Sequence, residues 1–202
     1  MLVIGIVGGI ASGKSEVAGI LGELGAAVIN ADKLGHQVLL SKDTILEIQN
    51  AWGDRVLDET GNVNRRKLGE IVFQNDSNEL DRLEQITHPK IEKLLCQQLT
   101  EIPDKYPAVI VDAPVMIKAG WDRHCDHLIF VDCPRAIRLA RALNRGWTAE
   151  MLDAREAAQA TLAEKKSKAS EIVDGSAPLE NLREQLTQIW QRWNLPLPVD
   201  RN

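Results

Sequence analysis

Apolar residues follow two patterns along the chain: short unbroken runs, and longer segments in which they recur every three or four positions. Residues 2–7 form a run of the first kind, which is typical of a buried strand. Residues 16–24 belong to the second kind, with Val17, Ile20 and Leu24 at the spacing of one helix face. Runs of the strand type return at residues 26–29, 108–112, 127–132 and 171–174. This alternation predicts an α/β fold built on a five-stranded parallel sheet.

The segment between residues 33 and 99 interrupts this alternation. Its apolar residues recur at helical spacing, and none of its apolar runs is long enough to extend the sheet. Asp76-Ser77-Asn78-Glu79 resembles a capping box, and Pro89 is expected in the first turn of a new helix. We therefore predict a helical insertion between the second and third strands.

Two helices are expected between the fourth and the fifth strand, and a closing helix with an apolar stripe is expected after the fifth. The first carries Arg138 and Arg141, which share one face with Arg145 because the three positions follow i, i+3 and i+7. The second begins after Thr148 as N-cap and continues through Lys165, with many charged and few large apolar residues. A charged helix of this kind, preceded by a glycine, is typical of a mobile lid.

A glycine-rich loop connects the first strand to the first helix. Residues 8–15 read Gly-Gly-Ile-Ala-Ser-Gly-Lys-Ser and fit the motif G-x-x-x-x-G-K-[ST] at every fixed position. Glycines allow successive backbone N–H groups to surround a phosphate chain, and the positive end of the following helix attracts it. Lys14 is then expected on the β- and γ-phosphates and Ser15 on Mg²⁺. The alternative is an ordinary glycine-rich turn, but the flanking strand and helix favour a nucleoside triphosphate site.

Further groups fit the needs of phosphoryl transfer. Asp32 follows the second strand, and the carboxyl ends of parallel strands border the ligand crevice. It is a candidate base for an acceptor hydroxyl, with a helix cap or an outer metal ligand as alternatives. Arg141 and Arg145 are candidate cations for the transferring phosphoryl group, and the alternative is a solvated helix face. Asp112 resembles a Walker-B acid, and Ala113-Pro114 after it offers no second acid to activate water, which favours an acceptor over hydrolysis.

Composition limits the partners of the chain. Its 202 residues suffice for one α/β core with small insertions, and its formal charge of −5 argues against a nucleic-acid or anionic-membrane partner. The 3 cysteines lack a C-x-x-C spacing, which favours a reducing, cytoplasmic environment over a disulfide framework. No run approaches the ~18 apolar residues of a membrane span. We expect a cytoplasmic enzyme that is a monomer or a weak homo-oligomer.

The ordered set of motifs resembles the dephospho-CoA kinases, a family similar in fold to the nucleoside monophosphate kinases. The loop by itself indicates only a superfamily, whereas the motifs after it are specific to the family. The resemblance covers nearly the whole chain and rests on the loop of residues 8–15, residues 28–32, Trp52-Gly53, Gly61 with Arg65, Leu68 and Phe73, His88-Pro89, Asp112-Ala113-Pro114, and Arg155 with Gln159 and Lys165.

This resemblance implies a three-layer P-loop kinase fold with a helical acceptor-binding insertion and a helical lid. The core would comprise residues 1–32, 101–140 and 168–195, the CoA-binding insertion residues 33–100, and the lid residues 141–167. The implied reaction transfers the γ-phosphoryl group of ATP to the ribose 3′-hydroxyl of dephospho-CoA, with Mg²⁺ as the metal.

The residues of the implied site fall into four groups. Catalysis is expected from Asp32, Lys14, Arg141 and Arg145; nucleotide binding from Gly8, Gly9, Ala11, Ser12, Gly13, Lys14, Ser15 and Glu16; acceptor binding from Asp32, Arg65, His88 and Pro114; and metal binding from Ser15.

The chain also departs from the family pattern. Asn30 stands where the family usually has Asp, Glu16 where it has Thr, and Ser170 and Gly175 where it has Asp and Asn. Lys118 occupies a position where an acid is usual. Two alternatives therefore stay open: another small-molecule P-loop kinase, acting on a nucleoside monophosphate or a sugar, and a nucleotide-gated binding protein without transfer activity.

Overall fold

The chain folds into two compact units. Met1–Asn30 and Glu101–Asn202 form the first, and Ala31–Thr100 form the second. The structure is a computed structural model and describes residues 1–73 and 77–197. Asp76, the first residue of the expected capping box, lies outside the described residues.

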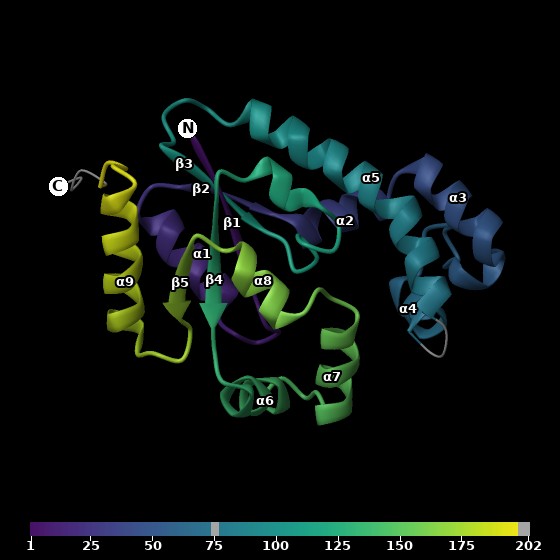
Figure 1. Ribbon diagram of the computed structural model, residues 1–202. Helices are drawn as coiled ribbons and strands as arrows, with labels where there is room; N and C mark the ends of the chain where they lie inside the picture. Colours follow the sequence, from purple (N-terminus) through teal and green to yellow (C-terminus); the bar gives the residue numbers. More distant parts are fainter. Residues whose placement is uncertain (74–76, 198–202) are drawn as a thin grey trace. The chain divides into compact units, whose positions relative to one another are not determined.

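The first unit is built on a parallel sheet whose five strands, in the described part of the chain, follow the order β2-β3-β1-β4-β5 (Figure 1). The strands are β1 (Leu2–Gly8), β2 (Ala27–Asn30), β3 (Ala108–Asp112), β4 (His127–Asp132) and β5 (Glu171–Asp174). Each pairing is parallel, so the carboxyl ends of all the strands lie at one edge of the sheet. The α/β fold with a five-stranded parallel sheet is confirmed.

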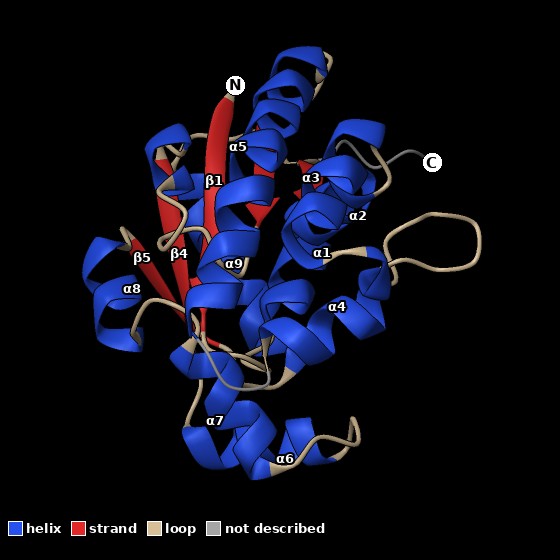
Figure 2. Ribbon diagram, turned by 90° about the vertical axis from the view of Figure 1, so that its right-hand side faces the viewer, coloured by secondary structure: helices blue, strands red, loops and turns tan. Residues whose placement is uncertain are grey.

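Helices cover both faces of this sheet. On one side of the strands lie α1 (Lys14–Glu23) and α9 (Leu179–Arg192), and on the other lies α8 (Leu162–Lys168) (Figure 2). Alternate strand residues point toward α1 and α9, and their side chains form a core with those helices, because successive side chains of a strand face opposite sides. That core includes Ile4, Ile6, Ile110, Ile129, Val131, Leu21, Leu186 and Trp190.

Among its described residues, the first unit contains three more short helical segments, all in the chain between β3 and β5. They are η2 (Trp121–His124), α6 (Arg135–Leu143) and α7 (Ala149–Ala157). None of the helices in residues 1–73 and 77–197 combines the length and the apolar character needed to cross a membrane.

The second unit is helical, as the pattern between the second and third strands predicted. Its segments are α2 (Ala31–Leu39), α3 (Lys42–Trp52), η1 (Asp54–Val56), α4 (Arg65–Val72) and α5 (Ser77–Glu101). Their apolar faces meet in a separate core made of Ile48, Trp52, Val56, Leu68 and Val72.

One expectation for this unit is wrong, because Pro89 does not begin a new helix. It lies inside α5, which runs unbroken for 25 residues. A proline in a helix interior costs roughly 3 kcal/mol, since it removes one hydrogen bond and crowds the preceding turn. Burial of apolar residues on both sides, such as Ile86 before it and Leu95 after it, favours one continuous helix despite that cost.

The expectation of a single helix after Thr148 is also wrong, because this segment forms two helices. Thr148 caps α7 as predicted, by accepting a hydrogen bond from Met151 N, but this helix ends at Ala157. Thr161 caps α8 in the same way by accepting from Glu164 N, and its extended backbone breaks the helical pattern. The continuation of α6 through Leu143 also means that residues 141–143 belong to α6.

Truncation of a core residue on α9 tests the packing of the first unit. Leu186 is fully buried in the core, so Leu186→Ala is expected to lower the free energy of unfolding by about 3 kcal/mol. The matched control Leu179→Ala removes a side chain of the same helix that is 48% exposed, and a change within about 0.5 kcal/mol is expected. Urea denaturation followed by circular dichroism measures both, and equal losses would contradict this core.

Candidate active site around the phosphate loop

The glycine-rich loop leaves the carboxyl end of the central strand β1 and ends in the first turn of α1. Ala11 has a φ of 59° and Gly13 a φ of 106°, so the chain turns sharply before the helix. The N–H groups of Glu16 and Val17 donate to the Gly13 carbonyl at 3.0 and 3.1 Å and begin the helix. The positive end of the α1 dipole therefore lies at the end of the loop.

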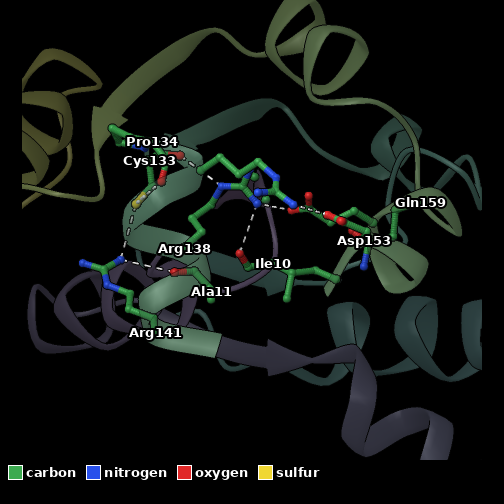
Figure 3. A network of polar contacts seen from close by, with 12 residues as sticks. Ile10, Ala11, Cys133, Pro134, Arg138, Arg141, Asp153 and Gln159 are labelled. Carbon is green, nitrogen blue, oxygen red and sulfur yellow. Dashed lines mark hydrogen bonds and ion pairs between the residues drawn. The ribbon is translucent and has the colours of Figure 1, made fainter. Parts of the chain in front are cut away.

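Cationic side chains bind each backbone carbonyl of the loop from Gly8 to Ser12. These contacts fix the orientation of the loop's peptide groups, and Gly9 O also accepts from the backbone N–H of Ser12 at 3.3 Å. Figure 3 shows the two arginines that reach Ile10 and Ala11. The contacts are Lys165 Nζ to Gly8 O (3.3 Å), Lys14 Nζ to Gly9 O (2.8 Å), Arg138 Nη1 to Ile10 O (3.5 Å), and Arg141 Nη1 to Ala11 O and Ser12 O (3.2 Å each).

Ser12 carries a polar atom that the described residues leave without a hydrogen-bond partner. Its side chain is fully buried, and its Oγ has no protein partner within residues 1–73 and 77–197. A buried hydroxyl without a partner costs about 1–3 kcal/mol. A phosphate oxygen bound in the loop is a suitable acceptor for this hydroxyl, so the orphan group fits an anion site.

The first turn of α1 presents three predicted site residues. Lys14 is half-buried, whereas Ser15 and Glu16 are exposed. The carboxylate of Glu16 interacts favourably with the helix dipole, because the first turn carries the positive end. This interaction favours an acid over Thr at this position in the nucleotide-free protein.

The arginines of α6 differ from one another in their surroundings. Arg138 is buried, donates from Nε to Cys133 O at 3.0 Å, and forms an ion pair with Glu156 of α7. Arg138 therefore adds no exposed charge to the face that it was expected to share with Arg141 and Arg145, because it is buried and Glu156 neutralises its charge. Arg141 is bound by backbone carbonyls, and Arg145 lies exposed beyond the end of α6.

Gly175, at the carboxyl end of β5, lies against the loop. Its carbonyl accepts from Arg141 Nη2 at 2.9 Å, and its N–H donates to Asp132 O at 2.7 Å. A Cβ at this position would lie 2.2 Å from the backbone oxygen of Ser12 and 2.5 Å from a methyl group of Val131. The loop thus approaches β5 so closely that only glycine fits, which accounts for the departure from the family's usual Asn.

Lys165, which the motif search did not assign to the site, reaches the loop from α8. Its side chain is 2% exposed, and its ammonium group donates to Gln159 Oε1 at 2.6 Å as well as to Gly8 O. Burial, together with the nearby charge of Lys14, lowers the pKa of Lys165 to about 8. The break between α7 and α8 makes this contact possible, because Gln159 lies in the connecting segment.

Two polar residues meet at the carboxyl edge of the sheet beside β1. The carboxylate of Asp112 is buried at the end of β3, and Asn30 Nδ2 at the end of β2 donates to its Oδ2 at 3.5 Å. An amide at position 30 avoids the repulsion that a second carboxylate would create here. Pro114, the predicted acceptor contact of this unit, follows two residues after Asp112.

The other predicted acceptor residues lie in the second unit. Asp32 is exposed in the first turn of α2, Arg65 is exposed at the start of α4, and His88 is half-buried on α5. The structure thus brings the loop residues, Lys14 and Arg141 together in one unit, and it places Asp32, Arg65 and His88 in the other. Their meeting in one site stays a prediction.

Side chains that commonly bind metal ions do not form a cluster in the described part of the chain. No group of three or more His, Cys, Asp and Glu side chains suited to a metal ion occurs within residues 1–73 and 77–197. The hydroxyl of Ser15 and the carboxylate of Asp112 are oxygen ligands of the kind that Mg²⁺ takes together with water and substrate phosphates.

Comparison with known proteins supplies the context for this loop and its neighbours. A family model of dephospho-CoA kinase matches residues 2–181. The chain belongs to the dephospho-CoA kinase family. The membership confirms the resemblance that the ordered motifs indicated, and it applies to both units of the fold.

Individual relatives agree with this membership. The dephospho-CoA kinase of Dehalococcoides mccartyi is 36% identical over 91% of this chain and 93% of its own length. That of Bacillus licheniformis is 36% identical over 96% of this chain and 97% of its own. The solved structure of the dephospho-CoA kinase from Campylobacter jejuni superimposes with a TM-score of 0.70 at 27% identity, over 95% of this chain and 96% of that one. The P-loop kinase fold is confirmed.

The close approach of Gly175 to the loop yields a prediction for stability and nucleotide binding. Gly175→Ala is expected to lower the free energy of unfolding by about 1–3 kcal/mol, because the new methyl group would overlap with Ser12 O. It is also expected to weaken ATP binding, since the loop must move. Urea denaturation and calorimetric titration with ATP measure the two effects.

Gly19→Ala is the matched control. Gly19 lies in the interior of α1 with nothing within 4 Å of an added Cβ, so alanine is expected to stabilise the protein by about 0.5–1 kcal/mol. A Gly175→Ala protein with wild-type stability and ATP affinity would show that the loop does not need this close approach.

Proposed function

We propose that the chain transfers the γ-phosphoryl group of ATP to the ribose 3′-hydroxyl of dephospho-CoA and so forms CoA and ADP. The single observation that carries this proposal is the match to the dephospho-CoA kinase family over residues 2–181. The acidic composition and the cysteine spacing support a cytoplasmic enzyme that acts on small molecules rather than nucleic acid or membranes, as a monomer or a weak homo-oligomer.

The donor half of the reaction is assigned to the loop from Gly8 to Ser15. Its N–H groups and the α1 dipole would hold the phosphates of ATP, and the buried Ser12 Oγ would donate to one of their oxygens. Lys14, whose Nζ lies on Gly9 O, would contact the β- and γ-phosphates. Glu16, exposed beside Ser15, completes the nucleotide-binding set predicted from the sequence.

Mg²⁺ is proposed as the metal of the reaction. Ser15 and Asp112 would hold it, because both offer oxygen atoms at the end of the loop and at the neighbouring strand end. When bound, Mg²⁺ neutralises negative charge that develops on the phosphate oxygens.

The acceptor half is assigned to residues of both units. Asp32 is the proposed base, since an exposed carboxylate is able to accept the proton of the ribose hydroxyl as the oxygen attacks the γ-phosphorus. It is equally able to act by positioning that hydroxyl. Arg65, His88 and Pro114 are the proposed contacts of dephospho-CoA.

Residues 141–167 are proposed as the lid, with Arg141 and Arg145 as its cations. Arg141 fixes the loop through the Ala11, Ser12 and Gly175 carbonyls, and its charge would also act on the phosphates. Arg145 follows the last turn of α6, and Gly146 beside it adopts a φ of 79°, a conformation suited to a hinge. Closure of such a lid would exclude water and so favour transfer over hydrolysis.

A turnover assay tests the proposed reaction directly. The purified chain, supplied with ATP, Mg²⁺ and dephospho-CoA, is expected to form ADP and CoA in equal amounts, detected by mass spectrometry of the CoA product. Nucleoside monophosphates and simple sugars, offered under the same conditions, are the matched acceptors of the alternative kinases. Phosphorylation of one of these, with no CoA formed, would refute the proposal.

Asp32→Asn separates a kinase from a nucleotide-gated binding protein. It is expected to lower kcat by about 10²–10⁴-fold, since the amide cannot accept the hydroxyl proton, while the ATP affinity stays within about threefold. Asp43→Asn is the control, because Asp43 also lies exposed in the first turn of a helix of the same unit. Steady-state kinetics and ATP titrations measure these effects, and a kcat within about threefold of wild type would remove Asp32 from the chemistry.

A further inference from the structure

Lys165 differs from the other lysines of its helix in its electrostatic surroundings. Lys166 pairs with Asp132 and Lys168 with Asp122, each at 2.8 Å and each on the surface. Lys165 is buried, and both of the hydrogen-bond partners that it has within residues 1–73 and 77–197, Gly8 O and Gln159 Oε1, are neutral. Burial of an ammonium group that has no carboxylate partner costs free energy, so a bound anion would stabilise Lys165 at this position.

The position of this ammonium group shows which anion would compensate its charge. Lys165 Nζ donates a hydrogen bond to Gly8 O, and Lys14 Nζ donates one to Gly9 O. Two cations therefore contact consecutive carbonyls of the phosphate loop. Their repulsion adds to the cost of burial. A phosphate chain in the loop would relieve both, because it brings several negative charges to this point.

The hydrogen bonds of Lys165 leave room for such a ligand. An ammonium group has three N–H donors. Gly8 O and Gln159 Oε1 accept two of them and fix the orientation of the group, at 3.3 and 2.6 Å. We infer that the third donor binds a phosphate oxygen of ATP, which makes Lys165 a second phosphate-binding lysine beside Lys14. This inference rests on ATP being the phosphoryl donor, as proposed above.

Four other charged groups act on Lys165 from the elements packed around it. Lys14 of α1 and Arg138 of α6 disfavour its charge, whereas Glu156 of α7 and Glu164 of α8 favour it through space. Burial outweighs them and gives the lowered pKa of about 8. Binding of a polyanion would raise this pKa, so ATP binding and protonation of Lys165 are linked.

The sign of the linkage follows from the two states. With its lowered pKa of about 8, Lys165 is partly deprotonated in the nucleotide-free protein at pH 8, and a bound polyanion would shift it toward the protonated form. Binding is therefore expected to take up protons at this pH. The affinity for ATP is expected to fall as the pH rises above this value.

Calorimetric titration of the full chain with ATP and Mg²⁺ at pH 8, in two buffers of different ionisation enthalpy, measures this uptake. Wild type is expected to take up a measurable fraction of a proton, and Lys165→Arg none, because arginine stays protonated in both states. Lys165→Met, close in volume, is expected to weaken ATP binding by about 10–100-fold and to abolish the uptake. The control Lys168→Met removes an exposed lysine of the same helix and should behave as wild type.

The outcomes separate this inference from the proposed function. Uptake by Lys165→Arg equal to that of wild type, or ATP affinity of Lys165→Met within about threefold of wild type, would overturn the role of Lys165. Melting curves identify a variant that is misfolded. If Lys165→Met is misfolded, the proton uptake of Lys165→Arg, which keeps the charge, tests the role of Lys165. A wild-type protein that binds ATP with Lys165-dependent uptake but does not phosphorylate dephospho-CoA would refute the proposed acceptor alone.

Discussion

The backbone carbonyls of the phosphate loop impose the constraint on which the rest of the first unit depends. Carbonyl groups that a tight loop removes from water need hydrogen-bond donors, because an unpaired acceptor there is costly. Here five consecutive carbonyls accept from Lys165, Lys14, Arg138 and Arg141. The loop is thus held by cations from α1, α6 and α8.

This arrangement gives the charged segment after β4 a structural role in addition to any role in catalysis. Arg138 joins the loop to α7 through Glu156, and Arg141 joins it to the carboxyl end of β5 through Gly175. Movement of α7 or α8 is therefore coupled to the loop by charge-assisted hydrogen bonds. These contacts connect the loop to α7 and to the end of β5 within the first unit.

Local patterns in the sequence were sufficient for the strands, the phosphate loop and the helical segment between β2 and β3. The strands follow from apolar runs with few competing signals, and the loop follows from fixed glycines between a strand and a helix. The patterns failed at Pro89 and at the break after Ala157. In the first case burial outweighed the local cost of proline, and in the second Thr161 capped a separate helix, as Thr148 had capped the one before.

The sequence by itself determined the sheet, the motif that identifies the loop and the membership in a kinase family, because these depend on spacing along the chain. Only the tertiary structure showed that Glu156 neutralises Arg138 and that the loop leaves no room for a Cβ at Gly175. It also showed that Lys165 is buried against the loop. Each of these depends on residues far apart in sequence, such as Gly8 and Lys165, that come together only when strands and helices pack. Helical spacing in the sequence predicts which charged side chains share one face of a helix. Only the folded structure shows which residues pack against that face.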